Sequence, residues 1–208
     1  KRDSKGDEQP VKKHSRTMDR SIPLNGSSGR LKGLSVIFAP TPLIAVFLWP
    51  MDTTAFFSMI RAGNLGSIRE GLEANPDLLN ARDPRGATPL IMASYYDHVP
   101  VVRYLLEQGA RIDEKDGSGN TALMGVCFKG YEEMARILIE AGADVNARNG
   151  MGGTCLIFAV TFNREGIAKL LIERGADTKA MDSQGKTALY HARTQGLQNL
   201  VSLLEKNS

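Results

Sequence analysis

Residues 83–90 read Asp-Pro-Arg-Gly-Ala-Thr-Pro-Leu, and variants of this octapeptide return three times at intervals of 33 residues. The copies begin at Asp116, Asn149 and Asp182, and each keeps Gly at its fourth position, Thr at its sixth and Leu at its eighth. Because only 21 of 208 residues are glycine, four glycines in register have a chance probability on the order of one in ten thousand. A constant period of this kind is typical of a solenoid, in which each structural unit stacks on the next.

The residues around the octapeptide predict two helices in each unit. Each Thr stands where a helix N-cap is wanted, and Pro89 follows at the first helical position, where its missing N–H costs little. A second apolar run at helical spacing follows, with a leucine in every unit (Leu105, Leu138, Leu171 and Leu204). Gly109, Gly142 and Gly175 stand just past these runs, where a left-handed C-cap is expected. Since one helix pair cannot bury its apolar face alone, we expect one continuous core.

The repeated unit resembles the ankyrin repeat, whose pattern is roughly D-x-x-G-x-T-P-L-H-x-A-A-x-x-G-H-x-x-x-V-x-x-L-L-x-x-G-A-D-x-N. Residues 139–146 read Ile-Glu-Ala-Gly-Ala-Asp-Val-Asn and match its ending. The resemblance covers residues 51–208 and implies an all-α fold, an ankyrin repeat solenoid of stacked helix-turn-helix units with β-hairpin loops and about five repeats. The expected repeats are 51–82, which is degenerate, then 83–115, 116–148, 149–181 and a C-terminal cap at 182–208.

The chain departs from the family pattern at two kinds of position. The family's His after Leu is replaced by Ile91, Met124, Ile157 and Tyr190, which puts its usual hydrogen bonds to neighbouring loops in doubt. Asp97 and Asn163 stand where the family has a Gly between the helices, and both residue types tolerate left-handed backbone geometry.

The charge of the chain is uneven. The net charge is +3 overall, but it is +5 over residues 1–50 and −2 over residues 51–208. Residues 1–50 are rich in basic and small polar side chains, so we expect a disordered basic tail there. Because Met51 directly precedes the first repeat, we hypothesise that it is the natural start and that residues 1–50 are not native.

A short apolar segment at residues 34–49 lies within this tail. It is shorter than the roughly 20 residues that a spanning helix needs. Pro40 and Pro42 also interrupt it. A membrane anchor or secretory signal formed by this segment remains the alternative interpretation.

The sequence contains few residues that could perform catalysis. Of three histidines, His98 and His191 lie at repeat positions where a structural role is expected, and no zinc-protease, Cys-x-x-Cys or nucleophile-elbow motif occurs. Cys127 and Cys155 fall in apolar runs of different repeats, so we expect reduced, buried thiols, with a redox pair as the alternative. We therefore expect no enzyme activity, no cofactor and no metal.

A protein-binding surface is the function that the resemblance implies. Ankyrin domains bind partners through a concave face made from hairpin tips and the ends of the inner helices. Aromatic residues recur at these positions and should form one stripe, and aromatic side chains are enriched at interface hot spots. The alternative is that these rings only pack between neighbouring repeats. The predicted protein-binding residues are Arg85, Tyr95, Tyr96, Asn120, Phe128, Lys129, Met151, Phe162, Gln184 and Lys186.

The expected protein is therefore a monomeric, cytoplasmic, non-enzymatic interaction scaffold that binds an unknown protein partner. Nucleic acid is not expected as a partner, because residues 51–208 carry a net charge of −2 and phosphate binding needs a basic face. The alternatives are an exported or membrane-tethered protein that uses residues 34–49, or a regulatory subunit of an enzyme.

Overall fold

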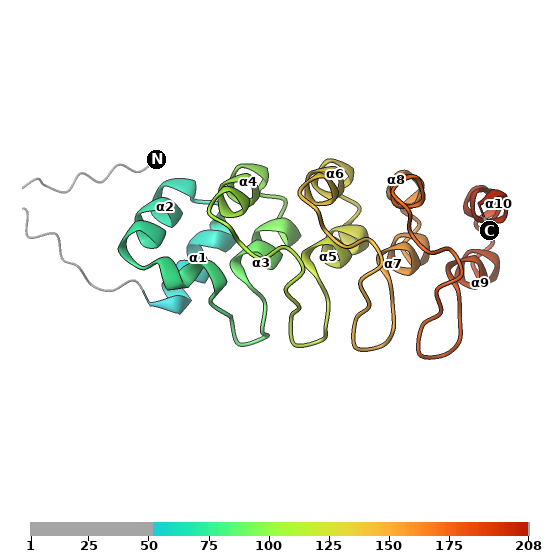
Figure 1. The fold of residues 1–208 in the computed structure, drawn as a ribbon, viewed down its shortest axis with the longest axis horizontal. Coiled ribbons are helices and arrows are strands. Elements are labelled where there is room, and N and C mark those ends of the chain that lie inside the picture. Colours follow the sequence, from blue (N-terminus) through green and yellow to red (C-terminus); the bar gives the residue numbers. More distant parts are fainter. Residues whose placement is uncertain (1–51, 208) are drawn as a thin grey trace, which may run out of the picture. The chain divides into compact units, whose positions relative to one another are not determined.

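The computed structural model describes residues 52–207. These residues form an all-α solenoid of helix pairs, as the sequence predicted, and Figure 1 shows the pairs following one another along the long axis. The tail and the apolar segment expected at residues 1–50 lie outside the described residues. The helices are α1 (Thr53–Ala62), α2 (Leu65–Ala74), η1 (Pro76–Asn80), α3 (Pro89–Tyr95), α4 (Val99–Glu107), α5 (Ala122–Lys129), α6 (Glu132–Glu140), α7 (Cys155–Thr161), α8 (Glu165–Glu173), α9 (Ala188–Thr194) and α10 (Gln198–Lys206).

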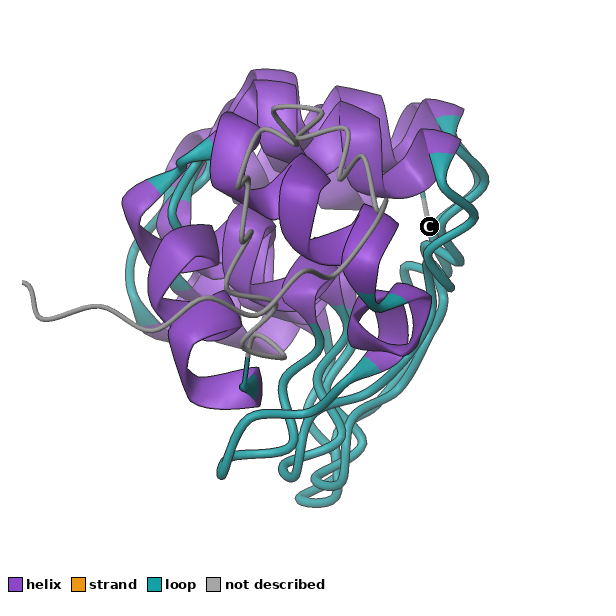
Figure 2. Ribbon diagram, turned by 90° about the vertical axis from the view of Figure 1, so that its left-hand side faces the viewer, coloured by secondary structure: helices purple, strands orange, loops and turns teal. Residues whose placement is uncertain are grey.

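The helices form two layers, and the hairpin loops form a third element beside them. The odd-numbered helices make an inner row, the even-numbered helices make an outer row, and the loops extend beyond the inner row (Figure 1). The view along the stack in Figure 2 shows the loops side by side at an angle to the helices. Within residues 52–207, strand-type pairing is limited to single bridges, Arg148 with Thr154 and Met181 with Thr187. We call the face between inner helices and loops the concave face.

The predicted caps are present. The hydroxyls of the four motif threonines accept a hydrogen bond from the backbone N–H three residues on, for example from Ile91 to Thr88 at 3.3 Å. The backbone is left-handed at Asp97 (φ 61°) and Asn163 (φ 54°), as their place in the pattern indicated. Local chemistry therefore determines where each helix begins and how the chain turns between the two helices of a pair.

The core runs through the whole stack. The four leucines of the outer helices (Leu105, Leu138, Leu171 and Leu204) are completely buried, and they belong to one cluster with the apolar side chains of the inner helices. Ile91, Met124 and Ile157, which replace the family's His, are also buried in this cluster. Apolar packing thus takes the place of the hydrogen bonds that the missing histidines would make.

Neighbouring repeats are joined by hydrogen bonds that recur with the period of the sequence. Arg82 donates to the carbonyl of Lys115, Lys115 to that of Arg148 and Arg148 to that of Met181, at 2.6–2.9 Å. The loop tips are also linked, because the N–H groups of Gly117, Gly150 and Ser183 donate to carbonyls of the preceding loop. These links hold the loops as a rigid array.

Two glycines differ in how closely the next loop approaches them. Gly119 (φ 81°) and Gly185 (φ 71°) occupy the same place in the second and the fourth loop, but a Cβ on Gly119 would lie 2.7 Å from the backbone nitrogen of Gly150, whereas a Cβ on Gly185 meets nothing within 4 Å. We expect Gly185→Ala to lower the free energy of unfolding by about 1–2 kcal/mol through backbone strain alone. Gly119→Ala should cost about 1–3 kcal/mol more, because a neighbouring backbone must move. Urea denaturation measures both, and equal losses would contradict the close approach.

Candidate functional site: the concave face

An aromatic stripe lies along the concave face. It consists of Tyr95 and Tyr96 at the end of α3, Phe128 near the end of α5 and Phe162 just after α7. The Tyr95 and Phe128 rings are nearly parallel, with centroids 6.5 Å apart, and the Phe128 and Phe162 rings meet edge to face at 4.5 Å. The predicted aromatic residues are therefore brought together by their places in successive repeats.

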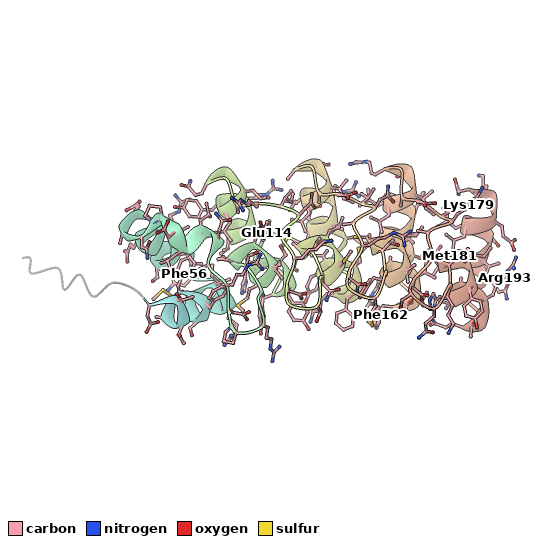
Figure 3. The ribbon with its side chains drawn as sticks, turned by 60° about the horizontal axis from the view of Figure 1, so that its bottom comes forward. Phe56, Glu114, Phe162, Lys179, Met181 and Arg193 are labelled. Carbon is pink, nitrogen blue, oxygen red and sulfur yellow. The ribbon has the colours of Figure 1, made fainter. Side chains whose placement is uncertain are left out.

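The rings of the aromatic stripe pack on one another and yet remain open to solvent. Their exposed fractions are 39% for Tyr95, 43% for Tyr96, 36% for Phe128 and 39% for Phe162. Figure 3 brings this face forward, and the Phe162 ring projects from the ribbon there. Each ring thus contributes to packing between repeats and also presents apolar surface.

The other predicted residues surround the stripe, with one exception. Arg85, Met151 and Gln184 lie exposed at loop tips. The Lys129 ammonium lies 4.9 Å from the Tyr95 ring centroid, and that of Lys186 lies 5.3 Å from the ring centroid of Tyr190.

The exception is Asn120. Its side-chain oxygen accepts a hydrogen bond from the Asn149 side chain at 2.9 Å, and its amide nitrogen contacts the Asp116 carboxylate at 3.4 Å. These contacts give Asn120 a structural role in joining two loops, which the sequence did not reveal.

Two of the cavities that open on the concave face are lined in part by residues of the aromatic stripe. The first, of about 300 Å³, lies beside Met151, Phe158 and Phe162, and His191 and Asp182 also line it. The second, of about 580 Å³, lies between α3 and the first loop, which comprises residues 81–88. It is lined by Tyr95, Tyr96, Met92, Arg61 and Arg85, among others. The surface of the first cavity is largely apolar, which is typical of sites that accept an anchoring side chain. The second cavity combines apolar side chains with the charged residues Arg61, Asp83, Arg85 and Asp116.

Sequence reasoning missed several residues of these cavities. Arg61, Met92 and Phe158 line them, but none of the three is among the predicted protein-binding residues, although Met92 and Phe158 stand at the same variable position of the family pattern, two residues after the motif Leu. One signal was available for Arg61, because it is the single charged residue in the apolar helix α1.

A partly buried His–Asp pair lies in the first cavity. The His191 Nε2 atom lies 3.1 Å from one Asp182 carboxylate oxygen, and the other oxygen accepts the backbone N–H groups of Gln184 and Lys186 at 2.9 and 3.0 Å. The Lys186 N–H lowers the pKa of Asp182, and the hydrogen bond with His191 lowers it further. Asn149 makes the same two backbone contacts in the preceding loop without a negative charge.

This pair predicts a pH dependence of stability. Because the pKa of Asp182 is lower in the folded state, its charge stabilises the fold above the unfolded pKa of about 4 and the contribution is lost as the pH falls through the folded pKa. Asp182→Asn keeps a side-chain acceptor, so the stability gap between wild type and this variant should be largest above about pH 5 and should narrow as the pH falls below about 4.

Urea unfolding at several pH values measures this gap. Asp182→Ala, which also loses two backbone hydrogen bonds, should still cost about 1–3 kcal/mol at low pH, where the charge no longer contributes. A gap between wild type and Asp182→Asn that is constant with pH would contradict a role for the charge.

The remaining candidate reactive groups have structural environments. Cys127 and Cys155 are free, completely buried thiols. Burial, together with a hydrogen bond to Cys155, raises the pKa of Cys127 well above its ordinary value, which keeps the thiol protonated and poorly nucleophilic. His98 contacts the carbonyl of Arg61 at 2.9 Å and so ties α1 to the following repeat.

Neither a cluster of metal-ligating side chains nor a membrane-spanning helix occurs among the described residues. Within residues 52–207, no three His, Cys, Asp or Glu side chains gather as metal ligands would. Among the helices of the same residues, none combines the length and apolar character required to cross a bilayer.

Comparison with known proteins identifies the class. The family model for ankyrin repeats in three copies matches residues 56–149 and 146–208, so the chain belongs to the ankyrin repeat family. This family is generally a non-enzymatic protein-interaction module.

Two curated relatives match shorter stretches. The human "DNA-binding protein RFXANK" is 38% identical over 60 residues, which cover 29% of this chain and 23% of that protein. The mouse "Ankyrin repeat and SAM domain-containing protein 6" is 34% identical over 60 residues, 29% of this chain and 7% of that protein. The chain thus matches less than a quarter of the length of either relative.

Proposed function

We propose that this protein is a non-enzymatic interaction scaffold that binds a partner protein through its concave face. The observation that carries the proposal is the aromatic stripe, in which four rings from three successive repeats form a continuous and partly exposed apolar surface. Clustered exposed apolar side chains mark interaction sites, whereas scattered ones do not. The two cavities flank this stripe and can accept side chains of the partner.

The rigidity of the face supports the same function. The stripe rests on helix ends that are fixed by packing, and the loops beside it are joined tip to tip by backbone hydrogen bonds. A surface that is ordered before binding loses little conformational entropy on binding, so more of the contact energy contributes to affinity. The residues proposed to contact the partner are therefore Arg85, Tyr95, Tyr96, Phe128, Lys129, Met151, Phe162, Gln184 and Lys186.

Hydrogen exchange of a purified complex tests this proposal. Partners captured by the full chain from cells that express it would be identified by mass spectrometry, and the strongest would be purified for the measurement. We expect protection on binding to concentrate in the loop tips and in the last turns of α3, α5 and α7. Protection confined to the outer helices α2, α4, α6, α8 and α10 would contradict the proposal.

A further inference from the structure

Positive and negative charges are segregated between the two layers of helices. The inner helices α1, α3, α5, α7 and α9 contain no Asp or Glu, and their charged side chains are Arg61, Lys129 and Arg193, with His191 beside them. The outer helices contain nine Glu against five Lys and Arg. The side of the molecule that carries the aromatic stripe is therefore the side without helical carboxylates.

Four cations of the concave face have no carboxylate partner among the described residues. Arg61 and Arg85 line the second cavity, and Lys129 lies over the Tyr95 ring. Lys186 occupies the position in its loop that Ala87 and Gly153 occupy in theirs, and those two residues line the second and the first cavity. Five cations elsewhere do have such partners: Arg82 and Arg111 with Glu114, Arg103 and Arg136 with Glu133, and Arg193 with Glu205. The concave cations are thus available to a ligand.

The aspartate carboxylates near this face already accept hydrogen bonds within the loops. Asp83, Asp116 and Asp182 are half-buried, and one oxygen of each accepts two backbone N–H groups of its own loop. These hydrogen bonds offset part of the negative charge of Asp83 and Asp116, which line the second cavity, and of Asp182, which lines the first. Arg61 and Arg85, which line the second cavity with Asp83 and Asp116, are exposed, whereas the three aspartates are half-buried.

Building on the proposed function, we propose that the concave face recognises an acidic segment of a partner protein that carries bulky apolar side chains. The apolar side chains contact the aromatic stripe and enter the two cavities, and the carboxylates pair with Arg61, Arg85, Lys129 and Lys186. These cations come from α1, the first loop, α5 and the last loop, so they are distributed along the whole stack. With helix spacings of roughly 10 Å and about 3.3 Å per extended residue, an extended segment of about 12 residues spans them.

The geometry of the stripe favours a peptide over a nucleic acid. Base stacking requires free ring faces. Here the Tyr95 ring is nearly parallel to that of Phe128, at an interplanar angle of 7°, and Lys129 lies over Tyr95. Ring edges and cavities remain, and these fit aliphatic and aromatic side chains.

Selection from a random peptide library tests the proposal. Dodecapeptides displayed on phage would be selected on the immobilised full chain, and selected peptides would be synthesised with a fluorescent label for polarisation measurements. We expect enrichment of peptides that carry net negative charge and at least one Leu, Ile, Phe or Trp. Their affinity should fall as the salt concentration rises.

Two matched charge variants localise the binding. R61Q/R85Q/K129Q/K186Q removes the concave cations, and R103Q/R136Q/K169Q/K206Q removes four cations of the outer helices while leaving residues 1–50 unchanged. The concave variant should raise the Kd of the acidic peptides by at least about tenfold, because four exposed ion pairs are lost together. The outer variant should leave the Kd within about twofold.

The outcomes separate this inference from the proposed function. Selected peptides that are neutral or basic, and that lose affinity on Phe128→Ala with Phe162→Ala, would overturn the acidic partner while leaving the concave binding face intact. A selection that yields no peptide sensitive to the aromatic or the concave charge variant would overturn both. Labelled (dT)20 or a 20-base-pair duplex binding more tightly than every selected peptide would overturn the peptide in favour of nucleic acid.

Discussion

Replacing Leu138 with Ala is expected to lower the free energy of unfolding by about 2–5 kcal/mol. Leu138 lies in α6 in the middle of the stack, is completely buried and belongs to the continuous apolar cluster. Truncation leaves a cavity between repeats that cannot collapse, because hydrogen bonds between the loops hold the spacing of the repeats. Urea denaturation followed by circular dichroism measures the loss.

Leu204 provides the matched control for this change. It occupies the same position in α10 and is equally buried, but it belongs to the last described helix pair, which packs against α8 on one side. In a solenoid, stability is the sum of repeat and nearest-neighbour terms, so a terminal change affects fewer interfaces. Leu204→Ala should therefore cost less and permit local unfolding of the last repeat. Equal losses at both positions would contradict a stack that is stabilised by its interfaces.

Truncating the aromatic stripe is expected to abolish tight partner binding. Phe128→Ala and Phe162→Ala should each weaken binding by at least about 2 kcal/mol, which is roughly a 30-fold rise in Kd, because these rings lie at the centre of the proposed surface. Both rings are more than one-third exposed, so the loss of stability should be smaller than for Leu138→Ala. Isothermal titration with a purified partner or selected peptide measures the Kd.

Met181→Ala provides the control for apolar exposure alone. Met181 is 53% exposed and lies apart from Phe162 in Figure 3. Its carbonyl accepts the last of the hydrogen bonds by which Arg82, Lys115 and Arg148 join neighbouring repeats. Its truncation should leave the Kd unchanged. Unchanged binding in Phe128→Ala and Phe162→Ala, together with a large fall in melting temperature, would show that the two rings belong to the core and not to a binding site.

The candidate site could be predicted only in part. The positions of Tyr95, Tyr96, Phe128 and Phe162 followed from the period, because residues near equivalent places in successive repeats must lie side by side. The contacts of Asn120 did not follow, since they depend on Asn149 in the next loop. A variable position in the family pattern indicates only that the residue there can change. Whether its side chain is open to a partner or packs against a neighbouring repeat follows only from the structure.

The sequence by itself determined the repeat, its helices and its core. These features depend on local chemistry that recurs every 33 residues: a capping Thr, an apolar run at helical spacing and a reversing turn. The tertiary structure decided which charged side chains and aromatic rings a partner could contact. Arg82, Lys115 and Arg148 are occupied by the following repeat, whereas Arg61 and Lys129 have no carboxylate partner among the described residues. That difference arises because the stack brings together groups about 33 residues apart, and their distance and orientation are set by packing between repeats.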